Sequence, residues 1–318
     1  IAVLPAPITT TLLPSVIGAV GGTPLVRLRR VAEAAPSVEV YVKLEYMNPG
    51  GSVKDRPALR IVTDAIADGR LTPDKILIDA TSGNTGVAYS MVGAAMDFRV
   101  QLVMPGNVSK ARKDITQAYG AELIFSSPLE GSDGAIQQVR RLVAEAPEKY
   151  FYADQYANPS NPLAHYHGTG PEILDALGDR ITHFVTGLGT TGTMMGTTRR
   201  LHENARAIRC VAVEPSEALH GLEGMKHLAS SLVPEIYDAS VPDEIMPVST
   251  DEGWDMADRV AEQEGLFVGH SSGANIFAAL RVAERLHAEG RGGAVVTVAC
   301  DRGDRYFAPL RWERKYAW

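Results

Sequence analysis

The chain has 318 residues, of which 45% are hydrophobic and 22% charged, an ordinary composition for a globular protein. A formal net charge of −7 at pH 7 argues against a broad nucleic-acid surface, so no nucleic-acid partner is expected. No apolar run reaches the length of a membrane span, because the apolar N-terminus is broken by several prolines. Cys210 and Cys300 lie in strand-like apolar runs without metal or disulfide spacing. We therefore expect a cytoplasmic protein with no membrane partner and with both cysteines in its core.

Predicted strands and helices alternate along the chain, joined by short Gly- and Pro-containing connections. The expected strands are residues 23–28, 38–44, 75–80, 99–104, 122–125, 183–186, 208–213, 267–268 and 294–298. The expected helices are residues 57–67, 87–95, 109–119, 170–177, 193–204, 250–264 and 274–289. This alternation predicts a parallel α/β architecture in two domains, with a ligand between them.

Residues 48–57, Asn-Pro-Gly-Gly-Ser-Val-Lys-Asp-Arg-Pro, form a corner between a predicted strand and a predicted helix. The two glycines allow a tight turn, and Ser52 can cap the helix that begins near Lys54. The helix N-terminus and a cationic neighbour such as Arg56 would lower the pKa of the Lys54 amine. Because an amine is nucleophilic only when deprotonated, Lys54 is a candidate catalytic residue. Taken alone, the motif is more typical of an exposed lysine in a first helical turn.

A glycine-rich loop, Gly187-Leu-Gly-Thr-Thr-Gly-Thr193, follows a predicted strand and opens a predicted helix. Backbone N–H groups in such a loop can bind a phosphate at the helix N-terminus. Thr190, Thr191 and Thr193 add hydroxyl donors, which suit a terminal phosphate monoester. The loop also matches Gly-x-Gly-x-x-Gly, and Glu214 ends the next strand where a ribose-binding acid would lie. A nicotinamide dinucleotide site, in an NAD-dependent dehydrogenase, is therefore the alternative.

Two further loops have the composition of binding sites. Thr81-Ser-Gly-Asn-Thr-Gly86 presents hydroxyls, an amide and backbone N–H groups to one point, which suits a carboxylate. Gly269-His-Ser-Ser-Gly273 precedes another helix, and Gln155 lies in a polar loop. Each of these segments is, by itself, also an ordinary helix cap or loop. His165 and His167 lack a third ligand nearby, so no metal site is expected.

In this order, the Lys54 motif and the three loops resemble the fold-type II pyridoxal-phosphate enzymes. The closest likeness is to the cysteine synthase and cystathionine β-synthase family, and it extends from about Gly22-Thr-Pro-Leu-Val to about Tyr306. The doubled threonine in Gly-Thr-Thr-Gly-Thr is most similar to the B-type cysteine synthases.

The resemblance implies two three-layer α/β domains with largely parallel sheets, a tryptophan synthase β-like fold. We assign residues 48–158 to a smaller N-terminal domain. Residues 1–47 and 159–318 would form the larger domain, with the active site in the cleft between the two.

The resemblance also implies a role for each site residue. Lys54 would form a Schiff base with pyridoxal 5'-phosphate and act as the general base. Asn84 would contact the ring oxygen of the cofactor, and Ser271 would face its pyridine nitrogen. The other cofactor-binding residues would be Gly189, Thr190, Thr191, Gly192 and Thr193. The substrate carboxylate would be bound by Thr81, Ser82, Gly83, Thr85 and Gln155.

The activity implied is β-replacement on an O-activated L-serine by sulfide or another sulfur donor, which gives L-cysteine. The stretch Leu219-His-Gly-Leu-Glu-Gly-Met-Lys226 contains Glu223 but no arginine for a phosphorylated donor, which favours O-acetylserine and leaves O-phosphoserine open. Cystathionine β-synthase and serine/threonine dehydratase are alternatives within the family. We expect a homodimer that acts on small-molecule amino-acid substrates.

Overall fold

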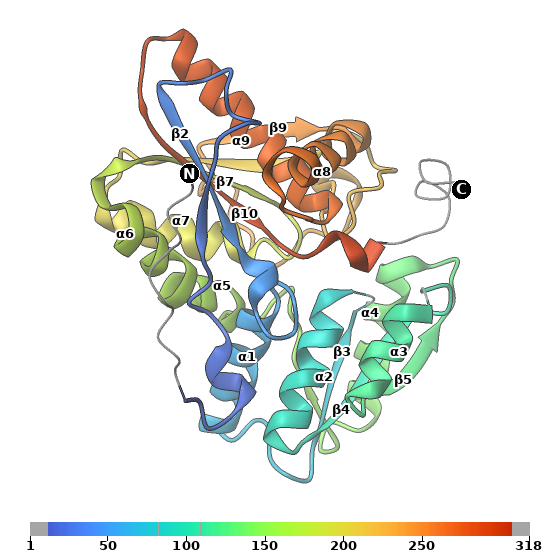
Figure 1. The fold of residues 1–318 in the computed structure, drawn as a ribbon. Coiled ribbons are helices and arrows are strands. Elements are labelled where there is room, and N and C mark those ends of the chain that lie inside the picture. The colour runs from blue at the N-terminus through green and yellow to red at the C-terminus, as the bar shows by residue number, and fades with distance from the viewer. Residues whose placement is uncertain (1–11, 82, 109, 307–318) are drawn as a thin grey trace.

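The computed structural model describes residues 12–81, 83–108 and 110–306. The described chain forms two halves, one above the other in Figure 1, and each half has its own sheet. Ser82, one of the expected substrate-binding residues, lies outside the described residues. No described helix combines the length and the apolar character needed to cross a membrane.

The smaller half contains a parallel four-stranded sheet of order β5-β4-β3-β6. Its strands are β3 (Ile76–Ala80), β4 (Arg99–Pro105), β5 (Glu122–Ser126) and β6 (Tyr150–Tyr152). Its helices are α1 (Asp55–Ala67), α2 (Asn84–Met96), α3 (Lys110–Ala118) and α4 (Gly131–Glu145). Apolar side chains of α1 and α2 pack on one face of the sheet, and those of α4 pack on the other. Strand β3 is accordingly buried at every position, as expected for a parallel strand covered on both faces.

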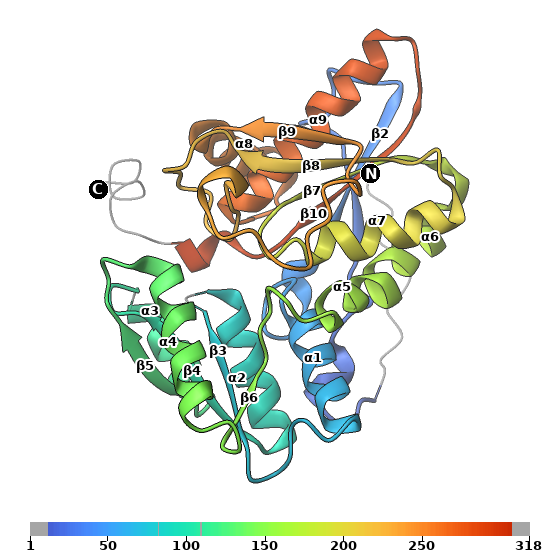
Figure 2. The same cartoon turned by 180° about the vertical axis from the view of Figure 1, so that it is seen from behind.

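The larger half contains a six-stranded sheet of order β1-β2-β10-β7-β8-β9, in which β1 is antiparallel to β2 and the other neighbours are parallel. Its strands are β1 (Leu25–Leu28), β2 (Val38–Leu44), β7 (Ile181–Gly187), β8 (Arg209–Pro215), β9 (Glu244–Val248) and β10 (Gly293–Ala299). Its helices are α5 (Ser160–Ala164), α6 (Gly170–Leu177), α7 (Gly192–Asn204), α8 (Thr250–Glu264) and α9 (His270–Ala288). Figure 2 shows β8 and β9 at the far edge of this sheet.

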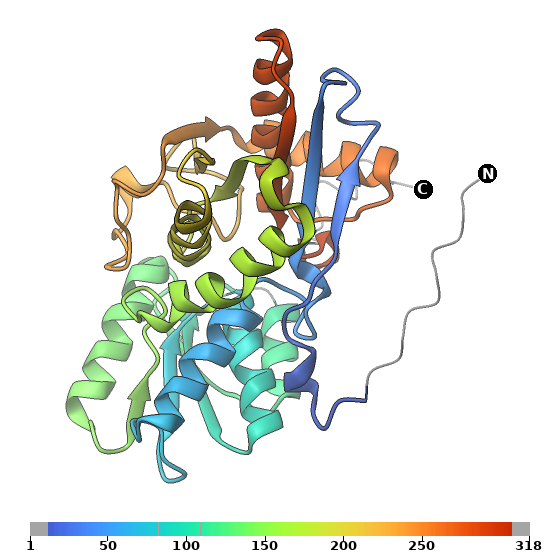
Figure 3. The same ribbon diagram turned by 90° about the vertical axis from the view of Figure 1, so that its left-hand side faces the viewer.

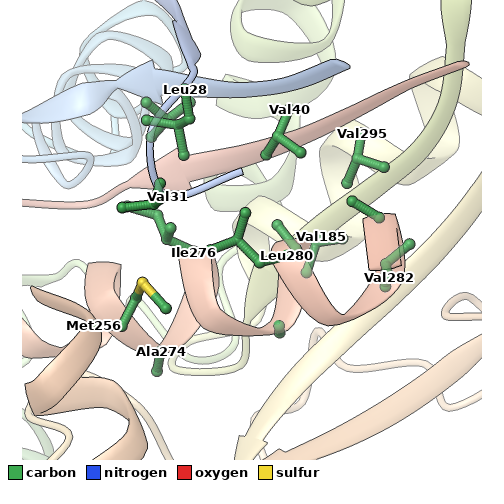
Figure 4. Close-up of a cluster of buried hydrophobic side chains, with 14 of the residues drawn as sticks. Leu28, Val31, Val40, Val185, Met256, Ala274, Ile276, Leu280, Val282 and Val295 are labelled. Atoms are coloured by element: carbon green, nitrogen blue, oxygen red, sulfur yellow. The ribbon is translucent and has the colours of Figure 1, made fainter. Parts of the chain in front are cut away.

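The larger sheet is also covered on both faces. Ile276 and Leu280 of α9 project toward Val40 and Val185 of the strands in Figure 4, within a core that also includes α8. A second core on the other face joins α6 and α7 to the same strands. The prediction of three-layer α/β units with largely parallel sheets is therefore confirmed.

Strands from opposite ends of the chain pair at the centre of the larger sheet. Strand β2 runs parallel to β10, from Val38 beside Gly293 to Leu44 beside Ala299. In Figure 3 the blue ribbon of β2 lies next to the red ribbons of β10 and α9. Because both strands end at the same edge, the turn that follows β2 meets the turn that follows β10, and Ser52 bridges Asp301 there. The carboxyl edge of a parallel sheet is the usual place for a ligand.

Most predicted elements have nearly the expected bounds, but some predictions were wrong. Residues 267–268 form no strand, because Val268 makes only an isolated bridge to Arg302. Helix α9 begins at His270 instead of residue 274, so the expected loop serine lies in a helical turn. The sequence analysis also missed α4, α5, β6 and β9. Helix α4 starts with Gly131-Ser-Asp-Gly134, residues that disfavour helix, and the other three elements are five residues or shorter.

The division at residues 48 and 158 stays a prediction. All strands of the smaller sheet lie within residues 48–158, and all strands of the larger sheet lie outside it. Ile17 and Val20 nevertheless pack against the core of the smaller half. The Gly22 N–H donates to Glu172 of α6, so the segment before β1 contacts both halves of the molecule.

Candidate active site

A cavity of about 470 Å³ lies between the two halves and is lined by residues of both. The structure brings most of the predicted site residues to its wall: Lys54, Thr81, Gly83, Asn84, Thr85, Gln155, Gly189, Thr190, Thr191, Thr193 and Ser271. Gly192 is not part of the wall and opens α7 just behind it. Segments that are distant in the sequence thus converge on one site, as the predicted order of motifs implied.

Lys54 immediately precedes the first residue of α1 and lines the cavity. The prediction that Ser52 caps this helix was wrong, because Lys54 is the N-cap residue and Ser52 Oγ accepts a hydrogen bond of 3.2 Å from the Lys54 backbone N–H within the preceding turn. Burial lowers the pKa of the Lys54 amine, whereas the nearby Cys300 and Asp301 side chains act in the opposite direction. The amine therefore loses its proton more readily than an exposed lysine, which a nucleophile or base requires.

Arg56 does not have the role that the sequence suggested. Its guanidinium pairs with Glu45 at 2.6 Å and with Glu172 at 2.7 Å, and Lys43 pairs with Glu172 at 2.6 Å. We call Lys43, Glu45, Arg56 and Glu172 the interior cluster. The lowered pKa of the Lys54 amine comes from burial, and Arg56 instead ties the first turn of α1 to the turn that follows β2 and to α6.

The loop between β7 and α7 has the geometry of an anion site. Thr191 precedes α7 in the left-handed region, with φ of 71°, which is unusual for a threonine. Its buried Oγ1 has no hydrogen-bond partner among the described residues. A Cβ on Gly189 would lie 2.2 Å from the Gly224 carbonyl oxygen, so only glycine fits there. An unpaired buried hydroxyl beside the N-terminus of a helix suits a phosphate.

Two residues that the sequence analysis did not assign to the site support this loop. Asn161 donates from Nδ2 to Thr190 Oγ1 at 3.1 Å. His165 Nε2 lies 3.3 Å from Thr193 Oγ1. Burial lowers the pKa of His165 well below its usual value, and the charges of nearby Arg56 and Lys54 add to this, so its ring is neutral. Nothing in the local sequence indicates these contacts.

The predicted carboxylate loop joins β3 to α2. Thr85 Oγ1 donates to Gln155 Oε1 at 2.7 Å, and Gln155 Nε2 donates to the Ala80 carbonyl oxygen at 3.2 Å. Gly83 precedes α2, and the position of a Cβ there is open, with nothing within 4 Å among the described residues. The first N–H groups of α2 are thus next to open space in the cavity wall.

Asn84 is held by residues from the other half of the molecule. Its Nδ2 donates to Asp301 Oδ2 at 2.5 Å, and Arg305 donates to its Oδ1. Burial raises the pKa of the Asp301 carboxyl, and hydrogen bonds from Tyr306 and Asn84 act against that rise. Neither Asp301 nor Arg305 was expected at the site, because they are more than two hundred residues from Asn84.

The turn after β10 contradicts one prediction. Cys210 is buried in the core as expected, whereas Cys300 is only partly buried against that core and also lines the cavity. Its backbone N–H donates to Ser272 Oγ at 2.8 Å, which fixes it beside the first turn of α9 that carries Ser271. Burial raises the pKa of the Cys300 thiol to about 12, although Lys54 lowers it, so the thiol is protonated at neutral pH.

Three side chains that could ligate a metal lie together away from the cavity. Nitrogen, sulfur and oxygen atoms of His202, Cys210 and Asp243 all lie within 4.8 Å of one another. His202 Nε2 is 3.0 Å from the Ile208 carbonyl oxygen, and Arg206 donates to its Nδ1. Burial raises the pKa of the Cys210 thiol to about 12. Both ring nitrogens of His202 are thus already in contact with protein groups, and burial keeps the Cys210 thiol protonated.

The dinucleotide alternative depended on Glu214, which is not in the cavity wall. Its carboxylate accepts a 2.7 Å hydrogen bond from the Leu228 backbone N–H and so fixes the segment after β8. A ribose-binding role would require this carboxylate to face the ligand.

Several known proteins are similar to this chain in both sequence and fold. Residues 16–301 match the family model described as pyridoxal-phosphate dependent enzyme. The chain is 48% identical over 303 residues to the cysteine synthase of Aquifex aeolicus, covering 95% of this chain and 93% of the relative. It is 44% identical over 299 residues to cysteine synthase B of Pseudomonas aeruginosa, covering 94% and 97%. The crystal structure of a cysteine synthase from Entamoeba histolytica has a TM-score of 0.92 at 37% identity, covering 97% of this chain and 93% of that one.

These similarities confirm the predicted family, fold class and cofactor, and they argue against a nicotinamide enzyme. Each alignment spans nearly all of both proteins, so the shared region includes every motif at the cavity. The chain therefore belongs to the family of pyridoxal-phosphate-dependent enzymes, within its cysteine synthase group.

Proposed function

We propose that this cysteine synthase uses O-acetyl-L-serine as its donor and sulfide as its sulfur source. The observation that carries the proposal is the single cavity that joins Lys54, the carboxylate loop and the loop before α7. A site for β-replacement needs a base, a hold on the substrate carboxylate and a hold on the cofactor phosphate at once.

The residues around the loop before α7 fit the phosphate of pyridoxal phosphate. The unpaired Thr191 Oγ1, the hydroxyls of Thr190 and Thr193 and the N-terminus of α7 form a neutral donor set suited to an anion. Asn84 would contact the ring oxygen, and Ser271 would face the pyridine nitrogen. When bound, the cofactor withdraws electrons from the α-carbon of the substrate and so lets the α-proton leave.

Lys54 is the residue proposed to hold the cofactor and then to take the α-proton. Its lowered pKa supports both tasks, because each needs the uncharged amine. The interior cluster holds the start of α1 through Arg56, two residues further on, so the Lys54 backbone is fixed while its side chain reacts. A fixed base at the reacting carbon lowers the entropic cost of proton transfer.

The substrate carboxylate is proposed to bind at the turn before α2. Thr81 would supply its hydroxyl, and Gly83 and Thr85 would supply backbone N–H groups, because the Thr85 hydroxyl already donates to Gln155 and holds that side chain in reach. The role of Ser82 stays a prediction. A carboxylate bound here would keep the reacting fragment in the cavity while sulfide enters and water is excluded.

The choice of an acetyl donor now has a different basis. The absence of arginine from residues 219–226 suggested it, yet Arg112 of α3 also lines the cavity. Arg112 is paired with Glu223, so the cavity offers no uncompensated guanidinium at this point. This pairing supports a leaving group without a large negative charge, as in an acetyl ester.

We also propose that the enzyme is a cytoplasmic homodimer. The support for a reducing compartment is that neither cysteine forms a disulfide and that Cys210 is buried as a free thiol. The dimer rests on the family resemblance. Light scattering of the purified protein measures the oligomeric state directly, and a monomer at micromolar concentration would contradict it.

A donor and acceptor panel tests the proposed activity. The holoenzyme is given O-acetylserine, O-phosphoserine or serine, each with sulfide, and serine with homocysteine. Chromatography then measures cysteine, cystathionine and 2-oxo acids. The proposal requires O-acetylserine with sulfide to give the fastest cysteine formation. Cystathionine as the main product, or 2-oxo acid released from serine regardless of sulfide, would support one of the two alternatives instead.

A further inference from the structure

Arg112 lies at the rim of the cavity, held between two residues of the larger half. It projects from α3, and its guanidinium lies 5.6 Å from the centre of the Tyr306 ring and pairs with Glu223. Tyr306 is itself fixed, because its hydroxyl donates to the buried Asp301. The guanidinium is therefore positioned by a ring on one side and a carboxylate on the other.

Other charged side chains line the same cavity. Glu130 and Asp133 also line the cavity, as does Lys226, whose amine pKa is lowered by burial and raised by Asp133. A doubly charged anionic group of a substrate that entered here would face the Glu223 carboxylate. The nearby cation that could bind such a group, Arg112, is already paired with Glu223.

We propose that Glu223 is a specificity-determining residue, which holds Arg112 and thereby excludes donors whose leaving group is a phosphate. This inference rests on the proposed function, since it names the leaving group that the same site accepts. A phosphate ester carries nearly two negative charges at neutral pH, whereas an acetyl ester carries none. Repulsion by one carboxylate at short range is enough to separate the two classes.

The same arrangement predicts what happens when the carboxylate is removed. The planar guanidinium of Arg112 can bind two phosphate oxygens at once, and its contact with the Tyr306 ring would remain in the variant. Glu223→Gln keeps the size of the side chain and removes its charge. The variant should therefore convert the rim from a barrier to phosphate into a binding site for it.

The experiment compares kcat/KM for O-phospho-L-serine and O-acetyl-L-serine, each with sulfide, in the holoenzyme. In Glu223→Gln the ratio of phosphoserine to acetylserine should rise about tenfold or more. Adding Arg112→Gln to that variant should return the ratio to about the wild-type value. Glu217→Gln is the matched control, because it removes an exposed carboxylate from the same segment without changing the cavity wall.

A binding measurement separates specificity from turnover. Calorimetric titration with inorganic phosphate should detect tighter binding to the Glu223→Gln holoenzyme than to wild type, by about tenfold. An unchanged donor ratio in Glu223→Gln, or a gain that survives the loss of Arg112, would overturn the inference. Failure of wild type and all variants to form cysteine from either donor would instead overturn the proposed function.

Discussion

Two arginine–glutamate pairs, Arg56 with Glu45 (the interior pair) and Arg112 with Glu223 at the cavity wall (the rim pair), differ chiefly in their contact with water. The Arg56 side chain is 5% exposed and its partner Glu45 is fully buried, whereas Arg112 is 23% exposed and Glu223 is 50% exposed. Glu45 also accepts from Thr23 at 2.6 Å, so the interior pair belongs to a saturated network. The rim pair has solvent as an alternative partner.

This difference decides what each pair can do. Removing one partner of a buried ion pair leaves an uncompensated charge and is strongly destabilising. An exposed pair contributes little to stability, because water and salt replace the missing partner. The interior cluster can therefore fix the backbone beside Lys54, while the rim pair is free to affect selectivity at a small cost in stability.

The largest effect should follow from removing the amine that the interior cluster supports. We expect Lys54→Ala to lower cysteine formation by about 10³-fold or more, because both cofactor attachment and proton transfer are lost. Borohydride reduction followed by mass spectrometry should find a pyridoxyl adduct on Lys54 of wild type and none in the variant. The matched control is Lys226→Ala, which removes another partly buried lysine of the cavity wall. In Lys226→Ala the adduct must still form on Lys54. An adduct found on Lys226 in wild type, or one lost from Lys54 in Lys226→Ala, would refute the assignment.

The second prediction tests the interior pair itself. Arg56→Met should lower the free energy of unfolding by about 3–5 kcal/mol, because the Glu45 carboxylate is left buried without its partner. Urea unfolding monitored by circular dichroism measures this change. Arg60→Met is the control on the same helix, since Arg60 pairs with Asp64 at one-third exposure, and it should cost less than about 1 kcal/mol. Equal losses in the two variants would remove the distinction between buried and exposed pairs.

Local motifs were predictable because each one is a contiguous strand, loop and helix. The Gly-Gly-Ser-Val-Lys corner, the loop at residues 187–193 and the helix at residues 250–264 all have their cause in adjacent residues. The helix is a clear case, since Ser249 and Glu252 form a capping box and Gly265 ends it in the left-handed conformation. Where adjacent residues agree in this way, one sequence is enough to predict the bounds of the element.

Contacts between distant segments could not be predicted from one sequence. Arg112 is 111 residues from Glu223, and Asn84 is 217 residues from Asp301. These contacts form only when the two sheets bring the distant segments together, at the cavity wall or directly behind it. Cys300 was misplaced for a related reason, because an apolar run predicts burial but not that its last residue reaches the carboxyl edge of the sheet, where ligands bind.

The third prediction uses pH to titrate the interior cluster. Burial raises the pKa of the Glu172 carboxyl, but bonds and charge from Arg56, a bond from Lys43 and one from the Gly22 N–H outweigh it and hold the pKa at about 2. Because this value lies below that of the unfolded chain, the stabilisation is complete above about pH 5 and is lost as the pH falls toward 2. The stability difference between wild type and Glu172→Gln should shrink by about 2 kcal/mol between pH 6 and pH 3. A stability difference that stays constant between pH 6 and pH 3 would show that Glu172 is not paired with Arg56 and Lys43 in solution.

The fourth prediction concerns the unpaired hydroxyl in the cavity. Thr191→Val should weaken retention of pyridoxal phosphate by about tenfold, since one donor to a charged acceptor is lost. Equilibrium dialysis against free cofactor measures this. Thr197→Val is a close control, because Thr197 Oγ1 is also buried and unpaired among the described residues but lies outside the cavity wall. Similar losses in both variants would mean that the effect is on packing in α7 and not on the phosphate.

The smallest effect should come from the rim pair, and it completes the contrast with Arg56. Arg112→Met should cost less than about 1 kcal/mol of unfolding free energy, because Glu223 then returns to water. The methionine still contacts the Tyr306 ring, so little of the remaining packing is lost.

The small cost of Arg112→Met should fall further at about 1 M salt, where the screening length is only about 3 Å, while the cost of Arg56→Met should persist. Urea unfolding of both variants at low and high salt makes the comparison in one series. A loss for Arg112→Met as large as that for Arg56→Met, and equally insensitive to salt, would mean that the rim pair supports the fold and is not free to select the donor.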